Sequence, residues 1–260
     1  MITPVYQNQV KRLHELAERY DLKLYCIGRS VCRRKIRAMD IGQSAQRCLL
    51  VGGVHGTEYL TVSAALQFAE DYAKHPCGMQ LTVIPCLNPD GTETALKKGI
   101  YWQANARGVD LNHNFDAGWQ KVKQREISLG ITSPAPTRYG GTYPESEPET
   151  RAVVRLCEAV RCERVLALHS QGREIYWDFG AHTPPCCLPL AEKMARAGGY
   201  RVASPEAIAT GGGFKDWFIE RFHRCGFTVE IGQGKNPLPL RALEKEYPHI
   251  SQILRVFVSG

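Results

Sequence analysis

Short apolar runs alternate with longer segments of helical periodicity along most of this chain. Nearly continuous apolar runs at residues 48–54, 81–87, 165–168 and 227–231 are typical of strands covered on both faces. Stricter alternation of apolar and polar positions at residues 22–28 and 35–41 predicts two half-exposed strands. Pro85 weakens the strand prediction for residues 81–87, because proline has no N–H to donate to a ladder.

Apolar residues at helical spacing predict six helices, over residues 5–20, 58–74, 147–159, 188–197 and 214–222 and from Leu240 onward. Ser146, followed three residues later by Glu149, predicts a capping box at the start of the third helix. Pro248 is expected to break or kink the last one. A turn is expected at Asn88-Pro89-Asp90-Gly91, and residues 99–145 are expected to form irregular loops.

Strands that alternate with helices predict the α/β class. We expect a single domain over residues 1–260, built on a mixed, mostly parallel twisted sheet with helices on both faces. The hydrophobic content of 43% is enough for a sizeable core. The chain has no internal repeat, no low-complexity stretch and no clear linker.

The charge pattern narrows the classes of partner. The net charge of +7 suits a small anionic substrate, and the basic residues are scattered apart from Arg33-Arg34-Lys35, so a nucleic-acid partner is not expected. No run approaches the roughly 18 apolar residues needed to span a bilayer. The first eleven residues have no apolar stretch that could act as a signal, so we expect a cytoplasmic location and no membrane partner.

The ten cysteines form no C-x-x-C pair, and Cys26, Cys48 and Cys86 lie within apolar runs. We therefore expect reduced cysteines in a reducing compartment. The adjacent Cys186 and Cys187 leave a vicinal disulfide or an accessory metal site open, but two ordinary thiols are the expected outcome.

Polar groups at the ends of the apolar runs are the candidate chemistry. His55 follows the run at 48–54, His169 follows the run at 165–168, and Glu230 closes a third. Because ligands gather at the carboxyl ends of strands in an open α/β sheet, these groups are expected to meet at one rim. Two imidazoles and one carboxylate, from His55, Glu58 and His169, are the ligand set of a catalytic zinc, and Glu230 would be the general base. We expect one Zn²⁺ ion.

Structural interpretations compete with this one. A histidine after a strand is often only hydrogen-bonded, and Glu58 could simply favour the start of a helix. Glu230 could be a structural acid paired with Lys215 or Arg224. The other histidines at positions 14, 75, 182, 223 and 249 have no such placement and are expected at the surface.

The chain resembles the zinc carboxypeptidase family of the carboxypeptidase A type, whose zinc is held by two histidines and a glutamate. The matching motifs occur in the family's order and cover most of the chain: His55-x-x-Glu58, Asn88-Pro89-Asp90-Gly91, Gly108-Val109-Asp110-Leu111-Asn112-His113-Asn114-Phe115, Ser146-Glu147-Pro148-Glu149-Thr150, His169-Ser170 and Phe227-Thr228-Val229-Glu230. The resemblance implies a carboxypeptidase-like fold and a metallopeptidase.

Within that family the chain is most similar to bacterial γ-D-glutamyl-diamino acid endopeptidases, through the segments at residues 105–112, 169–177 and 212–218. That resemblance implies cleavage of peptidoglycan stem peptides between D-glutamate and meso-diaminopimelate.

Two positions depart from the family pattern. Asn112-His113 replaces the family's Asn-Arg, and an imidazole cannot grip a terminal carboxylate with two prongs, so plain carboxypeptidase activity is disfavoured. We still expect Asn112 and His113 at the substrate. The segment at residues 206–213 has no tyrosine before its glycines. Arg107 matches the family arginine that polarises the scissile carbonyl or binds substrate carboxylate, with a surface salt bridge as its alternative.

Three functions follow as hypotheses. The first is zinc-dependent hydrolysis of an amide in an anionic muropeptide. The second keeps the zinc and makes the protein an N-acyl amino acid deacylase or a general metallocarboxypeptidase. The third is a zinc-containing binding protein with little turnover.

Overall fold

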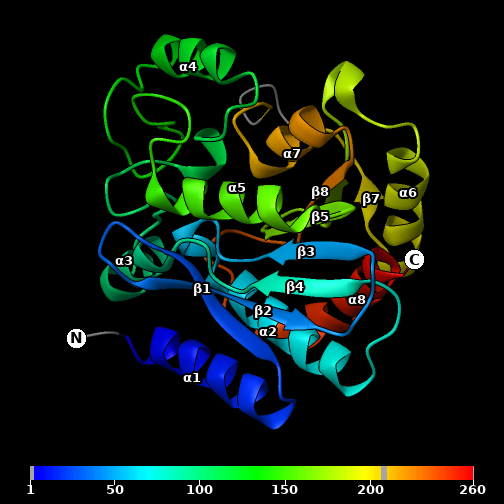
Figure 1. The fold of residues 1–260 in the computed structure, drawn as a ribbon. Helices are drawn as coiled ribbons and strands as arrows, with labels where there is room; N and C mark the ends of the chain where they lie inside the picture. Colours follow the sequence, from blue (N-terminus) through cyan, green and yellow to red (C-terminus); the bar gives the residue numbers. More distant parts are fainter. Residues whose placement is uncertain (1–2, 206–209, 260) are drawn as a thin grey trace.

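One twisted sheet runs through the molecule, as the computed structural model of residues 3–205 and 210–259 shows (Figure 1). Its strand order is β1-β2-β4-β3-β5-β8-β6-β7. The strands are β1 (Lys23–Arg29), β2 (Lys35–Ile41), β3 (Arg47–Val51), β4 (Gln80–Ile84), β5 (Arg164–His169), β6 (Glu174–Tyr176), β7 (Arg201–Val202) and β8 (Cys225–Glu230).

The centre of the sheet is parallel and its flanks are mixed. β4, β3, β5 and β8 are parallel neighbours, whereas β1, β2 and β6 join through antiparallel pairings and β7 pairs parallel to β6. The predicted mixed, mostly parallel sheet is therefore confirmed. The carboxyl ends of β3, β4, β5 and β8 all point to one edge, and this edge carries the candidate site.

Helices cover both faces, as predicted. They are α1 (Pro4–Arg19), α2 (Tyr59–Lys74), α3 (Pro89–Lys98), α4 (Trp119–Ser128), α5 (Pro148–Val160), α6 (Cys187–Gly198), α7 (Phe214–Phe222) and α8 (Ala242–Val258), with short 3-10 turns η1 (Gly56–Glu58), η2 (Leu111–His113) and η3 (Gly180–His182).

Alternation along the central strands divides the core in two. Leu50 and Leu166 face a core shared with α1, α2, α6 and α8. Leu49 and Val165 face the opposite core, under α5 and α7. Both faces of these strands are thus buried, which explains why their sequences read as continuous apolar runs.

Several local predictions were wrong. The capping box does not form, because the N-cap of α5 is Glu147 and the Glu149 side chain turns away to accept from Val31 N and Asn105 Nδ2. Pro248 does not break α8, since it lies on the exposed side of a helix that continues to Val258. Solvent can bond there to the carbonyl that proline leaves without a partner.

The segments expected to be a turn and irregular loops contain two helices. α3 begins at Pro89, with Asn88 as its N-cap accepting from Gly91 N at 2.9 Å, and α4 lies within the supposedly irregular residues 99–145. Pro85 follows β4 directly, so the strand ends before it. No helix among the described residues has the length and apolar character needed to cross a membrane.

Candidate metal centre

The loop after β3 places the first two polar groups. His55 is the residue before the turn η1, and Glu58 ends this turn and precedes α2. The loop is packed tightly against α3: a Cβ on Gly56 would lie 2.3 Å from the backbone carbonyl of Gly91, so only glycine fits. Asn88 Nδ2 donates to the carbonyl of Val54 at 3.1 Å, which ties the start of α3 to the same loop.

The central strands place the other two groups. His169 is the last residue of β5 and Glu230 is the last residue of β8, and the two are register partners in the parallel pair β5–β8. Their side chains therefore leave the sheet on the same face, at the edge where the loop of His55 lies.

Three side chains converge on one point from these elements. His55 Nδ1 lies 2.9 Å from Glu58 Oε1, His169 Nδ1 lies 3.1 Å from Glu58 Oε2, and the two Nδ1 atoms are 3.3 Å apart. All three residues are buried. Donor atoms at the corners of a tetrahedron around zinc are about 3.3 Å apart, given bonds of about 2.0–2.1 Å. The donor set and its spacing therefore fit a zinc ion.

Asp110 supports this group from behind. Its Oδ1 atom lies 3.1 Å from His55 Nε2, and it also accepts the backbone N–H of Asn112 at 3.1 Å, while Oδ2 accepts that of Arg138 at 2.8 Å. A carboxylate on the far nitrogen of a metal-binding histidine fixes the tautomer that leaves the near nitrogen free. His169 Nε2 has no such partner among the described residues.

The protein groups shift each other's pKa values. Burial opposes ionisation of Glu58, but His55 and His169 lower its pKa to about 2. Burial also opposes protonation of His55, but Glu58 and Asp110 raise its pKa well above the ordinary value. The pKa of Glu230 is raised well above its ordinary value, first by burial and then by repulsion from the Glu58 carboxylate.

A cleft of about 530 Å³ opens beside the three converging residues. Its walls carry Glu230, two cationic side chains, two phenols and several amides. The lining residues are Tyr101, Gln103, His113, Arg138, Ser170, Gln171, Tyr176, Pro205, Glu230, Gly234, Lys235 and Asn236. The cleft is large enough for a peptide fragment.

Asn112 and His113, the predicted substrate-binding residues, line two different cavities. Asn112 shares a smaller neighbouring hollow with Glu230, although its Oδ1 accepts from Phe214 N at 3.1 Å. His113 lines the main cleft, but its Nδ1 lies 3.1 Å from the buried carboxylate of Glu126, so this nitrogen is not free for substrate.

The Arg107 side chain does not lie with His55, Glu58 and His169. Its side chain is 56% exposed and its guanidinium lies 3.5 Å from Glu147, so the salt-bridge alternative is what the structure has. Gln103 stands there instead, with its Nε2 atom 3.3 Å from His55 Nδ1.

Glu230 does not form the ion pair with Lys215 or Arg224 that was considered as an alternative. Lys215 pairs with Asp216, and Arg224 lies 3.5 Å from Glu163 and donates to the carbonyl of Cys162. Glu230 is left facing the cleft.

Sequence reasoning missed several residues of this site. Asp110 lies in the motif at residues 108–115 and was not predicted to take part in the site, although a carboxylate just before Asn112 and His113 was a usable signal. Gln103, Arg138, Tyr101 and Lys235 sit in loops, where no periodicity marks them. Within the segment at residues 206–213, which has no tyrosine, residues 206–209 lie outside the described residues.

A buried His-His-Glu cluster at the carboxyl edge of an α/β sheet, with a further glutamate in an adjoining cleft, defines a metal-dependent hydrolase. The chain belongs to the zinc carboxypeptidase family, whose model matches residues 10–256. The family resemblance expected from the motifs is thereby confirmed.

Two relatives of known name are similar to the chain in sequence. The chain is 33% identical over 270 residues to γ-D-glutamyl-L-diamino acid endopeptidase 1 of Lysinibacillus sphaericus, covering 90% of this chain and 66% of that protein. It is 30% identical over 196 residues to murein peptide amidase A of Escherichia coli K12, covering 70% of each. The chain thus spans about two thirds of the length of these relatives.

The fold is shared with bovine thrombin-activatable fibrinolysis inhibitor in its complex with tick carboxypeptidase inhibitor. The TM-score is 0.81 at 20% identity, covering 99% of this chain and 98% of that one.

Proposed function

We propose that this protein is a zinc-dependent peptidase that hydrolyses an amide in peptidoglycan stem peptides, at the bond between γ-D-glutamate and meso-diaminopimelate. The main support for a hydrolase is that His55, Glu58 and His169 converge beside a cleft that Glu230 also lines. The substrate class is supported by the likeness to an endopeptidase and an amidase whose names state γ-D-glutamyl-diamino acid and murein peptides.

His55 Nδ1, His169 Nδ1 and a Glu58 oxygen would hold the ion. A zinc ion bound there supplies Lewis acidity, which activates water and polarises a carbonyl. Asp110 holds the His55 ring in the orientation that this binding needs.

Glu230 is the group that moves the proton. It takes a proton from the attacking water and passes it to the leaving amine, as a general base and then a general acid.

Gln103 and Tyr101 face the same space. The Gln103 side chain is held by Thr137, which donates to its Oε1, so its Nε2 donor is directed toward the converging residues. An amide N–H in this position can stabilise charge developing on the scissile carbonyl oxygen. Tyr101 is 47% exposed in the cleft and offers a phenol there.

Arg138 and Lys235 favour an anionic substrate. Both are exposed side chains on the wall of the cleft, and across residues 3–205 and 210–259 no carboxylate lies within ion-pair distance of either. A muropeptide brings the free carboxylates of D-glutamate and diaminopimelate to such a wall. The backbone N–H of Arg138 donates to Asp110 Oδ2 at 2.8 Å, which ties the main chain at Arg138 to the carboxylate that contacts His55.

The other hypotheses predict different features. The resemblance implies that a general carboxypeptidase has an arginine at position 113 for a terminal carboxylate, and His113 is instead engaged with Glu126. A binding protein without turnover has no use for Glu230 directed into the cleft.

The direct test incubates the purified, zinc-loaded protein with L-alanyl-γ-D-glutamyl-meso-diaminopimelate and measures release of diaminopimelate. We expect release that a chelator abolishes and added Zn²⁺ restores. A panel of N-acyl amino acids and C-terminal peptides runs in parallel. Turnover confined to that panel would transfer the assignment to a deacylase or carboxypeptidase, and zinc binding with no turnover anywhere would favour the binding protein.

Two variants test the roles of residues. Glu230→Gln should lower kcat by about 10²-fold or more while zinc content stays unchanged. Arg138→Ala should raise KM for the anionic tripeptide more than it lowers kcat. Glu158→Gln and Arg155→Ala, at exposed positions on α5, are the matched controls and should leave both constants unchanged.

A further inference from the structure

Three sulfur atoms gather at the edge of the sheet opposite to the candidate metal centre. Cys225 is the first residue of β8, five residues before Glu230, and Cys186 and Cys187 stand at the start of α6. The three sulfurs lie within 4.8 Å of one another. The expectation of ordinary thiols was wrong for Cys187, which is disulfide-bonded to Cys225 of β8, whereas Cys186 is a free cysteine.

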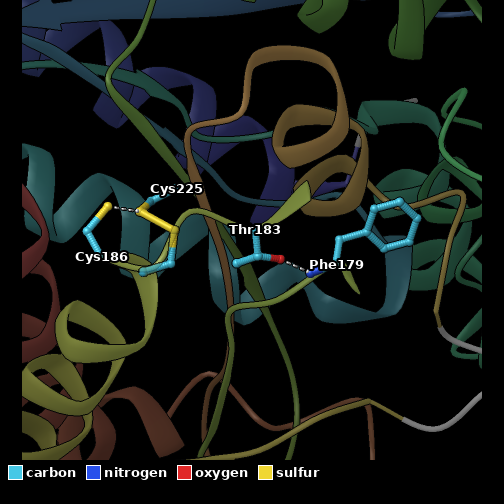
Figure 2. Close-up of a disulfide and its surroundings, with 5 residues drawn as sticks. Phe179, Thr183, Cys186 and Cys225 are labelled. Carbon is cyan, nitrogen blue, oxygen red and sulfur yellow. Dashed lines mark hydrogen bonds between the residues drawn. A yellow bond between two sulfur atoms is a disulfide. The ribbon is translucent and has the colours of Figure 1, made fainter. Parts of the chain in front are cut away.

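One bond already joins two of these sulfurs. Cys187 and Cys225 form a disulfide between the start of α6 and the sheet, with Cα atoms 5.4 Å apart (Figure 2). The disulfide takes two of the three sulfurs, so the oxidised cluster is not a three-thiolate metal site.

The third sulfur is in contact with this disulfide. Cys186 Sγ lies 3.6 Å from Cys225 Sγ, drawn as a dashed line in Figure 2. The burial of the three residues differs sharply: Cys187 is fully buried and Cys225 is 7% exposed, whereas Cys186 is exposed. A reagent in solution can therefore reach the Cys186 sulfur most easily, and this sulfur is in contact with the buried disulfide.

We propose that Cys186, Cys187 and Cys225 form a thiol–disulfide exchange site, in which Cys186 opens the buried Cys187–Cys225 disulfide and makes it reachable by small thiols such as glutathione. The proposal is independent of the peptidase activity proposed above, because it uses none of the groups around the metal centre.

The exchange balances without an oxidant. The Cys186 thiolate attacks Cys225 Sγ, a Cys186–Cys225 bond forms, the Cys187–Cys225 bond breaks, and Cys187 leaves as a thiolate that takes up a proton. The contact of Cys186 with Cys225, rather than with its chain neighbour, selects this product over a vicinal disulfide. The new disulfide has one exposed sulfur.

Reduction then requires an external thiol. Glutathione attacks Cys186 Sγ, Cys225 leaves as a thiolate, and a second glutathione releases Cys186 and departs as glutathione disulfide. Two electrons pass from two glutathione molecules to the protein. Without Cys186, the external thiol must attack a sulfur that is nine-tenths or more buried.

The first experiment uses the unmodified protein. Native protein is held in a glutathione redox buffer, quenched with acid, alkylated and mapped by tandem mass spectrometry. We expect Cys187–Cys225 and Cys186–Cys225 linkages together, with no other cysteine paired. Recovery of Cys187–Cys225 alone at every glutathione ratio, or of a Cys186–Cys187 linkage, would overturn the proposal.

The second experiment compares variants. Cys186→Ser should slow native-state reduction of Cys187–Cys225 by about tenfold or more, while Cys77→Ser, at an exposed cysteine elsewhere, should reduce at the wild-type rate. Equal rates for all three proteins would contradict the role of Cys186. Cys187→Ser supplies an unambiguous map, because oxidation with glutathione disulfide should then join Cys186 to Cys225, and persistence of two free thiols would also refute the proposal.

Discussion

A buried carboxyl group at the start of α5 gives the stability of this protein a specific pH dependence. Glu149 is fully buried, and burial raises its pKa from 4.5 to about 7 against the opposing hydrogen bonds from Val31 N and Asn105 Nδ2. The folded protein thus keeps a proton on Glu149 that the unfolded chain releases. Linkage then requires the free energy of unfolding to fall as pH rises through this interval.

The size of the effect follows from the two pKa values. With 4.5 for the unfolded chain and about 7 for the folded protein, the contribution of Glu149 becomes less favourable by about 2.5 kcal/mol between pH 5 and pH 8. Most of the loss occurs below pH 7, where only the unfolded chain ionises. Above pH 7 both states are ionised and the dependence flattens.

Glu149→Gln removes the titrating group while keeping its shape. Urea unfolding of wild type and variant is measured from pH 5 to pH 8 at fixed zinc. The stability difference between variant and wild type should shift by about 2.5 kcal/mol in favour of the variant as pH rises, whatever its value at pH 5. Glu158→Gln, at an exposed position on the same helix, should show no such trend. Parallel pH profiles for wild type and Glu149→Gln would refute the reasoning.

Three further predictions concern residues predicted or observed at the candidate site. Asp110→Asn should weaken zinc binding by about 10–100-fold in competition with a chromophoric chelator, and an unchanged Kd would show that Asp110 does not support His55. His55→Ala should lose zinc yet melt cooperatively, because the two cores are large without the ion; a non-cooperative melt would contradict this. Arg107→Ala should leave kcat and KM within about twofold of wild type, since its exposed ion pair is worth little, and a large loss of kcat would return Arg107 to the reaction.

The long elements were predictable from periodicity because packing and pattern agree there. The apolar runs that became β3, β5 and β8 are buried on both faces, and the helical segments present one apolar side to a core. α3 and α4 were missed because they begin within segments rich in turn-forming residues. There Asn88 acts as a helix cap rather than as part of an isolated turn.

The candidate site divides in the same way. That His55, His169 and Glu230 lie together was predictable because each follows or closes an apolar run, and strand direction brings such residues to one edge. Arg107 and Gln103 lie in a loop, and the course of a loop cannot be predicted from hydrophobic periodicity. Of the two residues, the charged Arg107 was the stronger candidate for a catalytic role than the neutral amide of Gln103. The disulfide joins residues 38 positions apart, and no known cysteine spacing predicts such a pair.

The pairing of His169 with Glu230 across β5 and β8 makes the relative position of these two side chains a property of the hydrogen-bonded ladder. Inserting one residue into β8 would preserve every apolar side chain in the sequence but turn the terminal acid toward the opposite surface of the sheet. The lengths of β5 and β8 are therefore constrained to the single residue, because a shift in either would separate the two side chains.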